Sequence, residues 1–227
     1  TGPPAPREPP DVIEPKASEL LIRFEKLSGG FNAYSAISNY EMTGSVETVT
    51  MGSRDVKSYK AYREGTKRQM IVLSSDATGQ IKDLRDGKTR KLKSDFGLEY
   101  EVPFVMPVAE ADFLHSLMRS MKLDNYSKLL YLGIFDRGNR KVHLIDGKTK
   151  DGETVAIYFD TETNMLAGFE GPFGGLSFAD YRKVDNVMLP YNISSQDFLN
   201  IELSEIKLNT KIDPAVFERK INCYDTP

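Results

Sequence analysis

The sequence predicts a mainly β (α+β) domain, in which one antiparallel sheet of ten or eleven strands is joined by a small amount of helix. Apolar and polar residues alternate with a period of two over residues 38–93 and again from residue 127 onward, which is typical of strands. Turn residues interrupt this alternation about every 8–12 residues, as in antiparallel sheets. Strands do not alternate with long helices, and this excludes a doubly wound α/β fold.

The first 16 residues are expected to form an extended tether outside the core. The segment TGPPAPREPPDVIEPK contains six of the 12 prolines of the chain, and proline fixes φ and lacks an amide donor. A tail without function explains this composition equally well. We therefore divide the chain into a tether (1–16), one folded domain (17–221) and a C-terminal tail (222–227).

Two segments have the periodicity of helices. In ASELLIRFEKLSGG (17–30), Ser18 is the expected N-cap, an apolar face recurs at spacings of four and three, and Gly-Gly ends the helix. The second segment, VAEADFLHSLMRSM (108–121), has a Met-rich apolar face. Such a face suits contact with a flexible surface, and core packing explains it as well.

The segment FADYRKVDNVMLPYNI (178–193) could hold either catalytic groups or a hairpin. Asp180 and Arg182 resemble an acid and an electrophile, but Asp185-Asn186 is a turn signal between two arms that alternate in polarity. We interpret the segment as a hairpin. Asp180 and Arg182 are then expected to form a cross-strand polar pair on the outer face.

Composition excludes several classes of protein. The 30 basic and 33 acidic residues give a net charge of −3, which is not the strongly basic surface of a nucleic-acid-binding protein. The longest apolar runs, such as LLYLGIF (129–135), are far shorter than the roughly 20 residues of a membrane-spanning helix. Cys223 is the only cysteine, so neither an internal disulfide nor a thiolate metal cluster is expected. Because the chain begins with Thr1, we expect a processed N-terminus from which a signal segment was removed.

The sequence contains no convincing set of catalytic or metal-binding groups. His115 and His143 are far apart and have no acidic partner at ligand spacing. The loop GPFGG (171–175) lacks the Lys-Ser/Thr of a phosphate-binding loop. The acidic pairs Asp151/Glu153 and Asp160/Glu162 fall in turns, where carboxylates usually cap backbone amides. We therefore expect a protein that is not an enzyme and has no metal or cofactor.

One hairpin with an Asp86-Gly87 turn carries a cluster of basic residues. A solvated hairpin is one interpretation, and a patch that binds a lipid headgroup or a protein partner is the other. The cluster consists of Lys82, Arg85, Lys88, Arg90, Lys91 and Lys93.

Five segments together resemble the LolA/LolB-type superfamily of lipoprotein carriers, especially the outer membrane lipoprotein-sorting proteins and their uncharacterised branch. They run from about residue 17 to residue 220. The segments are ASELLIRFEKLSGG with FNAYSAISNYEMTGSVE, AYREGTKRQMIV, YFDTETNML, DYRKVDNVMLPYNI and NTKIDPAVFER. In the last segment, Asp213 can cap a short helix whose first position is Pro214.

The resemblance implies an incomplete β-barrel of about eleven strands with helices covering its mouth. In the carriers, the concave apolar face shelters the acyl chains of a lipoprotein, and the proteins are periplasmic or, in the LolB type, anchored to the outer membrane by a lipid. The resemblance therefore implies an exported protein with one of these two locations. The carriers also use a strand arginine to latch the lid, for which Arg63 and Arg68 are both candidates.

We accordingly predict a non-catalytic protein of the bacterial cell envelope that binds lipid or lipoprotein acyl chains, with a membrane or protein partner in the envelope and no nucleic acid. An alternative is an envelope scaffold whose barrel is filled by its own side chains. A third is a hydrolase, which would need an Asp/Arg/Tyr cluster in a deep pocket. The expected cavity residues are Met70, Val72, Phe113, Leu117, Met118, Met121 and Tyr158.

Overall fold

The computed structural model describes residues 12–218 except positions 51, 77–78, 87, 104–117, 119, 173 and 196–198. Its helical elements are α1 (Pro15–Ser28), α2 (Phe31–Ser35), η1 (Leu123–Asn125) and α5 (Ala215–Glu218). The first strands are β1 (Asn39–Thr50), β2 (Ser53–Glu64), β3 (Arg68–Ser75), β4 (Gly79–Arg85), β5 (Thr89–Ser94) and β6 (Glu99–Pro103). They are followed by β7 (Tyr126–Arg137), β8 (Arg140–Thr149), β9 (Thr154–Asp160), β10 (Leu166–Gly171), β11 (Gly174–Val184), β12 (Val187–Ser195) and β13 (Leu199–Leu208).

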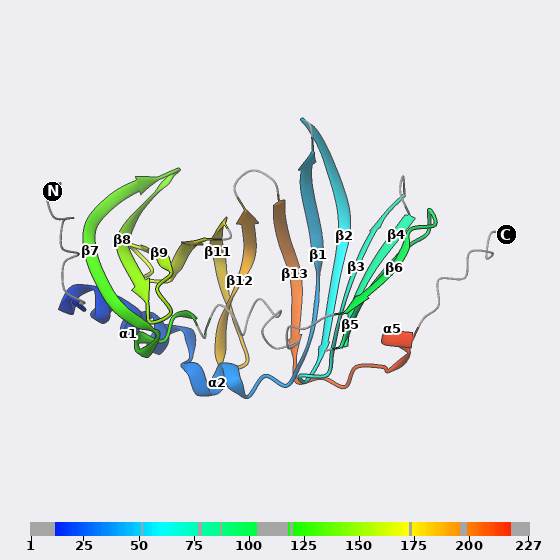
Figure 1. Ribbon diagram of the computed structural model, residues 1–227, viewed down its shortest axis with the longest axis horizontal. Coiled ribbons are helices and arrows are strands. Elements are labelled where there is room, and N and C mark those ends of the chain that lie inside the picture. Colours follow the sequence, from blue (N-terminus) through cyan, green and yellow to red (C-terminus); the bar gives the residue numbers. More distant parts are fainter. Residues whose placement is uncertain are drawn as a thin grey trace, which may run out of the picture.

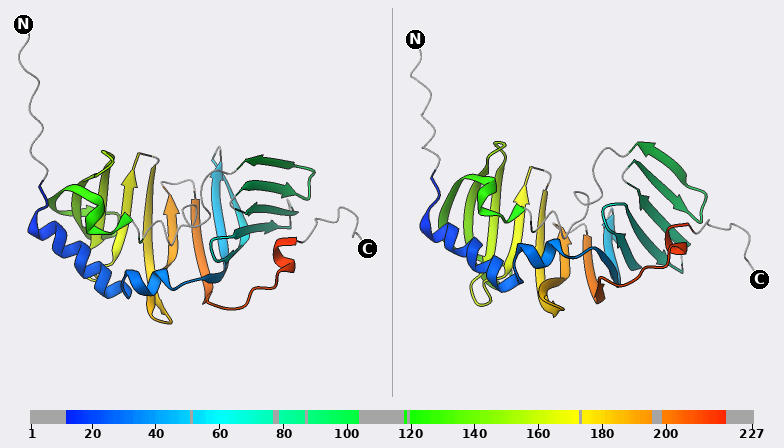
Figure 2. Two further views of the ribbon diagram at one scale, coloured as in Figure 1. Left: turned by 60° about the horizontal axis from the view of Figure 1, so that its bottom comes forward. Right: turned by 90° about the horizontal axis from the view of Figure 1, so that it is seen from below.

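The 13 strands of the described residues all belong to one antiparallel sheet in the order β6-β5-β4-β3-β2-β1-β13-β12-β11-β10-β9-β8-β7 (Figure 1). The chain starts in the middle with β1 and runs outward to β6. It then returns from the opposite edge, β7, to β13, which pairs with β1. The sheet is open and curved, with α1 and α2 along one end of the strands (Figure 2).

The strand count is larger than the ten or eleven that the sequence predicts. The strand Glu99–Pro103 (β6) lies at the edge of the sheet and is exposed at every residue. It lies beyond residue 93, where the predicted alternation ends, and its apolar residues Tyr100 and Val102 are exposed. The architecture, one antiparallel sheet with few helices, is as expected.

Helix α1 packs on one face of the sheet, which we call the inner face; the opposite side is the outer face. The buried apolar residues of α1 are Ala17, Leu20, Leu21 and Phe24. The ring of Phe24 lies 5.8 Å from that of Phe159 on β9. The helix thus fills the inner face over the β7–β12 half of the sheet.

The start of α1 differs from the expected N-cap. The helix begins at Pro15, and the hydroxyl of Ser18 donates to the carbonyl of Pro15 within the first turn. Proline is favoured there because the first amide of a helix has no partner within the helix. The expected Gly end is confirmed: Gly29 has a φ of 107°, and a Cβ on it would lie 2.2 Å from the carbonyl oxygen of Asn186.

The segment before α1 is also part of the fold. The Leu129 amide donates to the carbonyl of Val12, and the Glu14 amide donates to the carbonyl of Leu129, both at 2.9 Å. Residues 12–14 therefore cover part of the β7 edge. The expected tether up to residue 11 and the tail 222–227 lie outside the described residues.

The C-terminal helix forms as predicted. The Ala215 amide donates to the Asp213 carboxylate at 2.9 Å, so Asp213 caps α5. Phe217 is buried and packs with Ile212 against Met70 of β3. Met70 alternates along β3 with the residues that face inward, so its side chain points to the outer face. The C-terminal segment that contains Ile212 and Phe217 therefore covers the outer face.

The 178–193 segment is a hairpin of β11 and β12, but the predicted polar pair is wrong in its geometry. Asp180 has a φ of 52°, and its carboxylate bonds to Arg182 on the same strand at 2.6 Å. The Arg182 guanidinium lies 4.2 Å from the ring centroid of Tyr191 on β12. The irregular backbone at Asp180 breaks the alternation, so the two side chains meet along the strand and not across it.

The helices in the described part of the chain all lack the length and the apolar character that a membrane-spanning helix needs.

Candidate functional site

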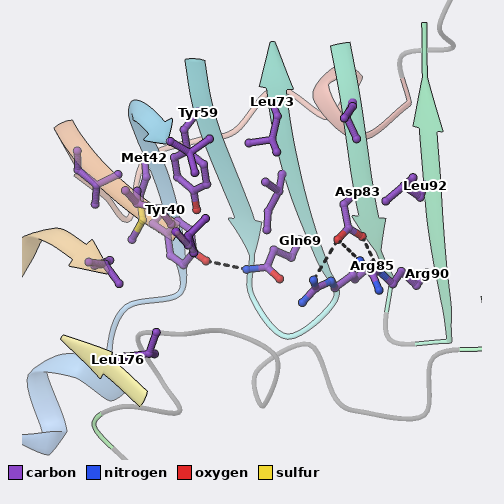
Figure 3. A pocket seen from close by; sticks show the side chains of 17 residues that line it. Tyr40, Met42, Tyr59, Gln69, Leu73, Asp83, Arg85, Arg90, Leu92 and Leu176 are labelled. Carbon is purple, nitrogen blue, oxygen red and sulfur yellow. Dashed lines mark hydrogen bonds and ion pairs between the residues drawn. The ribbon is translucent and has the colours of Figure 1, made fainter. Parts of the chain in front are cut away.

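A pocket of about 440 Å³ lies on the inner face, where the strands from β1 to β5 meet those from β11 to β13 (Figure 3). Its size falls within the roughly 300–1,000 Å³ range of small-molecule sites. The apolar lining residues are Met42, Val46, Ile71, Leu73, Ile81, Leu92, Leu176, Ile193, Leu199, Ile201 and Leu203. The polar lining residues are Tyr40, Tyr59, Gln69, Asp83, Arg85 and Arg90.

The register of the sheet assembles this lining. On β3, Ile71 and Leu73 lie opposite Ala61 and Tyr59 of β2. In a strand, alternate residues face the same side, so these two side chains point into the pocket. The neighbouring Met70 and Val72 were expected in the cavity, but the structure places them on the outer face in the cluster with Phe217. An offset of one residue moves a side chain to the other face of a sheet.

The other expected cavity residues are also placed elsewhere or lie outside the described residues. Met118 and Met121 are buried in the core cluster that also contains the apolar side of α1. Tyr158 lies on the outer face, where its hydroxyl donates to Glu170 at 3.1 Å. Phe113 and Leu117 lie outside the described residues.

A row of polar residues crosses the inner face at one end of the pocket. Register pairs Tyr40 with Arg63, Arg63 with Gln69, Gln69 with Arg85, and Arg85 with Arg90. We call these five residues the polar band. On β1, β3 and β5 the next inner-facing residue is apolar, namely Met42, Ile71 and Leu92, whereas on β4 it is Asp83, followed by Ile81. The pocket is therefore polar at one end and apolar along the rest of its length.

Asp83 holds the two outermost arginines of the polar band. Its carboxylate accepts hydrogen bonds from Arg85 at 3.0 Å and, through both oxygens, from Arg90 at 2.9 and 3.0 Å. Burial raises the pKa of Asp83, but the hydrogen bonds and charges of Arg90 and Arg85 outweigh burial, so the pKa lies below its usual value. The carboxylate is consequently ionised at neutral pH.

The predicted basic hairpin is thus divided between the two faces of the sheet. Arg85 and Arg90 line the inner pocket, whereas Lys91 and Lys93 pair with Glu101 and Glu99 of β6 on the outer face. The sequence showed the charges but not this division, because strand register decides which side chains share a face.

Arg63 links the polar band to the segment that follows the helices. Its side chain is 2% exposed, and its guanidinium donates to the backbone carbonyls of Ile37 and Ser38. It also lies 5.3 Å from the ring centroid of Tyr40. Arg68, the other candidate latch, pairs with Glu64 at 2.7 Å. Of the two arginines, Arg63 is therefore the one that bonds to the segment between α2 and β1.

Gln69 is a buried polar residue with one unsatisfied atom. It is 4% exposed, and its Nε2 donates to the hydroxyl of Tyr40 at 3.0 Å. Its Oε1 is buried and has no hydrogen-bond partner within the described part of the chain. Buried polar atoms are rarely left without a partner, so this amide marks a point where a ligand could bind.

A second hollow, of about 540 Å³, brings together acidic, basic and phenolic groups near the β11–β12 hairpin. Asp160 caps its own turn by accepting from the amides of residues 162 and 163, and these bonds outweigh burial and lower its pKa. The Tyr181 hydroxyl donates to the carbonyl of Leu166 at 2.9 Å, and burial raises its pKa well above the usual value. The Arg140 guanidinium donates to the carbonyl of Phe178. These groups are held by structural bonds, and the pKa shifts of Asp160 and Tyr181 are both directed away from neutrality, whereas general acid–base work requires a pKa near the working pH.

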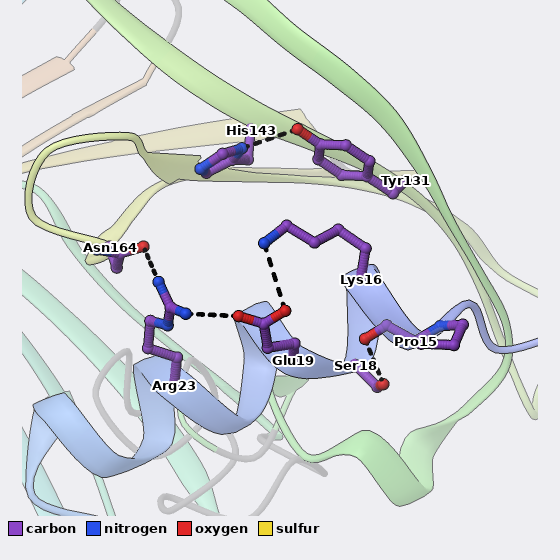
Figure 4. Close-up of polar contacts among 8 residues, drawn as sticks. All are labelled: Pro15, Lys16, Ser18, Glu19, Arg23, Tyr131, His143 and Asn164. Carbon is purple, nitrogen blue, oxygen red and sulfur yellow. Dashed lines mark hydrogen bonds and ion pairs between the residues drawn. The ribbon is translucent and has the colours of Figure 1, made fainter.

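His143 also has a structural partner. Its Nδ1 lies 3.0 Å from the Tyr131 hydroxyl, close to the charged side chains of α1 (Figure 4). Burial and the nearby charges of Lys16 and Arg23 lower the pKa of His143, so the ring is neutral at pH 7. His115 lies outside the described residues, and no group of ligating side chains that could hold a metal is found among the described ones.

The sequence matches no protein-family model, and it matches none of the curated proteins. Solved structures, in contrast, do match. A DUF1329 family protein from Desulfovibrio piger has a TM-score of 0.54 at 11% identity, over 89% of this chain and 95% of its own. A LolA superfamily protein from Nitrosomonas europaea has a TM-score of 0.53 at 10% identity, over 88% of this chain and 96% of its own. The fold is LolA/LolB-like.

A third match extends this likeness. An outer membrane lipoprotein-sorting protein domain from Vibrio parahaemolyticus has a TM-score of 0.51 at 9% identity, over 89% of this chain and 96% of its own. The resemblance read from the five sequence segments is therefore confirmed at the level of the fold. At such low identity the likeness extends to the fold alone, and function has to be argued from the pocket.

Proposed function

We propose that this protein is a non-catalytic lipid- or lipoprotein-binding protein of the bacterial cell envelope, which shelters acyl chains in the inner-face pocket. The observation that carries the proposal is the unequal filling of the inner face. Side chains of α1 such as Phe24 fill the β7–β12 half, whereas an apolar pocket is left in the other half.

An acyl chain is the ligand that this apolar surface favours. Transfer of hydrocarbon from water into an apolar site contributes roughly 0.8 kcal/mol for each buried methylene. The pocket presents eleven apolar side chains and has a volume of about 440 Å³. Its mixture of aliphatic walls and one polar end suits a long, flexible ligand with a single headgroup.

The similarity to a lipoprotein-sorting domain supports a location in the envelope, either in the periplasm or anchored to the outer membrane. A lipoprotein or the membrane that releases it would then be the partner. Phe113 and Leu117 remain proposed members of a lid over the pocket. The rival function is a scaffold whose barrel is filled by its own side chains. The half of the sheet that packs against α1 is filled in this way.

Native mass spectrometry of the delipidated protein tests this proposal. Palmitate and a lipidated peptide should each form a complex with one protein chain, whereas an unlipidated peptide of the same sequence should not. A protein that retains neither acylated ligand would be the scaffold and not the binder.

A further inference from the structure

The polar band and the apolar lining follow one another along the same strands. On β3 the inner-facing residues change from Gln69 to Ile71 and Leu73, and on β5 they change from Arg90 to Leu92. Figure 3 shows Asp83, Arg85 and Arg90 together on the side of the pocket opposite Tyr40. A ligand lying along the strands would meet hydrocarbon over most of its length and charge at one end.

The described side chains at that end carry more positive than negative charge. Among the described lining residues, the ionised side chains are the carboxylate of Asp83 and the guanidiniums of Arg85 and Arg90. One negative charge therefore faces two positive charges. Arg90 uses its Nε and Nη2 to bind Asp83, and its side chain is 35% exposed. A guanidinium has five N–H donors in a planar fork, so Arg90 has donors left for a second oxyanion.

Gln69 provides a second, independent observation. Its buried amide is bonded to Tyr40 at one end only. The two ends of an amide have the same shape, so the group can turn over. Its oxygen would then accept from the Tyr40 hydroxyl, and its N–H₂ would point toward the bound oxyanion. A ligand headgroup at this place would satisfy a polar group that is otherwise costly to bury.

We propose that the polar band is the headgroup site of the bound acyl chain and that it selects an oxyanion, with Arg90 binding the anion directly and Gln69 completing its hydrogen bonds. The inference rests on the proposed function, because it names the ligand class of the same pocket. A fatty-acid carboxylate and a lipid phosphate share this chemistry. Both match the planar donor fork of arginine.

Isothermal titration calorimetry with three single-chain ligands tests the site. The ligands are palmitate, methyl palmitate and 1-palmitoyl lysophosphatidate, each delivered from cyclodextrin. They are titrated into wild type, Arg90→Gln and Lys91→Gln. Lys91 is the matched control, because it is the next residue on β5 but pairs with Glu101 on the outer face. Thermal unfolding of each variant verifies that it is folded.

In wild type, at least one of the two anions should bind about tenfold or more tightly than the neutral ester, the usual effect of a charge-assisted hydrogen bond. Arg90→Gln should lose this preference for the anion over the ester, and Lys91→Gln should keep it. The anion that binds more tightly, palmitate or lysophosphatidate, shows whether the natural headgroup is a carboxylate or a phosphate.

Two results would overturn the headgroup site while the lipid-binding pocket stands: wild type that binds the ester as tightly as both anions, or Arg90→Gln that keeps the preference. If Arg90→Gln does not fold, the comparison of the ligands on wild type alone decides. Wild type that binds none of the three ligands would instead refute the proposed function, and the headgroup site with it.

Discussion

Replacing Leu73 by Asn should weaken acyl-chain binding without unfolding the protein. Leu73 lines the pocket in the middle of its apolar part, opposite Ile81 and Tyr59, and is only half-buried in the free protein. Its amide replacement would stay hydrated until the ligand covers it. Covering an unpaired amide costs about 1–3 kcal/mol in proteins, so the dissociation constant for palmitate should rise roughly 5- to 140-fold.

The control is Leu132→Asn on β7, where the same change is made at a side chain that is 51% exposed and lies outside the pocket. Affinity for palmitate is measured by calorimetry, and folding is measured by thermal unfolding. The reasoning is refuted if Leu73→Asn binds palmitate as wild type does, or if Leu132→Asn weakens binding equally. Either result would mean that the acyl chain does not lie in this pocket.

Three further changes test the pocket and its supports. Asp83→Asn should destabilise the protein by about 1–3 kcal/mol at pH 7, because two arginines lose their carboxylate. The folded-state pKa of Asp83 is lowered, so the difference in unfolding free energy should be full above about pH 4 and fade as the pH falls through the folded-state pKa, as measured by urea denaturation. Gly44→Ala should destabilise by about 1–3 kcal/mol, since a Cβ would lie 2.1 Å from the carbonyl oxygen of Glu202 on β13; a melting temperature equal to that of wild type would contradict this. Phe24→Ala should cost about 3–5 kcal/mol of unfolding free energy, while Ile22→Ala on the exposed side of α1 should change it by less than about 0.5 kcal/mol.

Much of the fold could be predicted because its signals are local. Alternation identifies the long strands, Asp213 and Pro214 identify the short C-terminal helix, and Gly29 marks the end of α1. Features that depend on partners distant in the sequence were missed. The N-terminal residues 12–14 look like part of a Pro-rich tether, and only their pairing with Leu129 makes them part of the fold.

The side chains of the pocket could not be identified for a related reason. The strand Arg68–Ser75 contains the apolar run from Met70 to Leu73, so both of its faces look buried. Both faces are indeed covered, one by the pocket and the other by the segment that carries Phe217. A strand buried on both sides lacks the alternation that would tell its faces apart. The sequence therefore suggested Met70 and Val72, and the register selects Ile71 and Leu73.

The polar band is hard to explain by stability alone. Burying an ion pair removes two charges from water, and apolar residues of similar volume often stabilise a fold equally well or better. The inner face elsewhere is filled by such residues, as Phe24 and Phe159 show. Three arginines on this face therefore call for a second reason. Arg63 has one in the carbonyls of the segment between α2 and β1. Arg85 and Arg90 both bond to the carboxylate of Asp83 at the end of an apolar pocket, and an anionic headgroup would use the N–H donors of Arg90 that this carboxylate does not accept from.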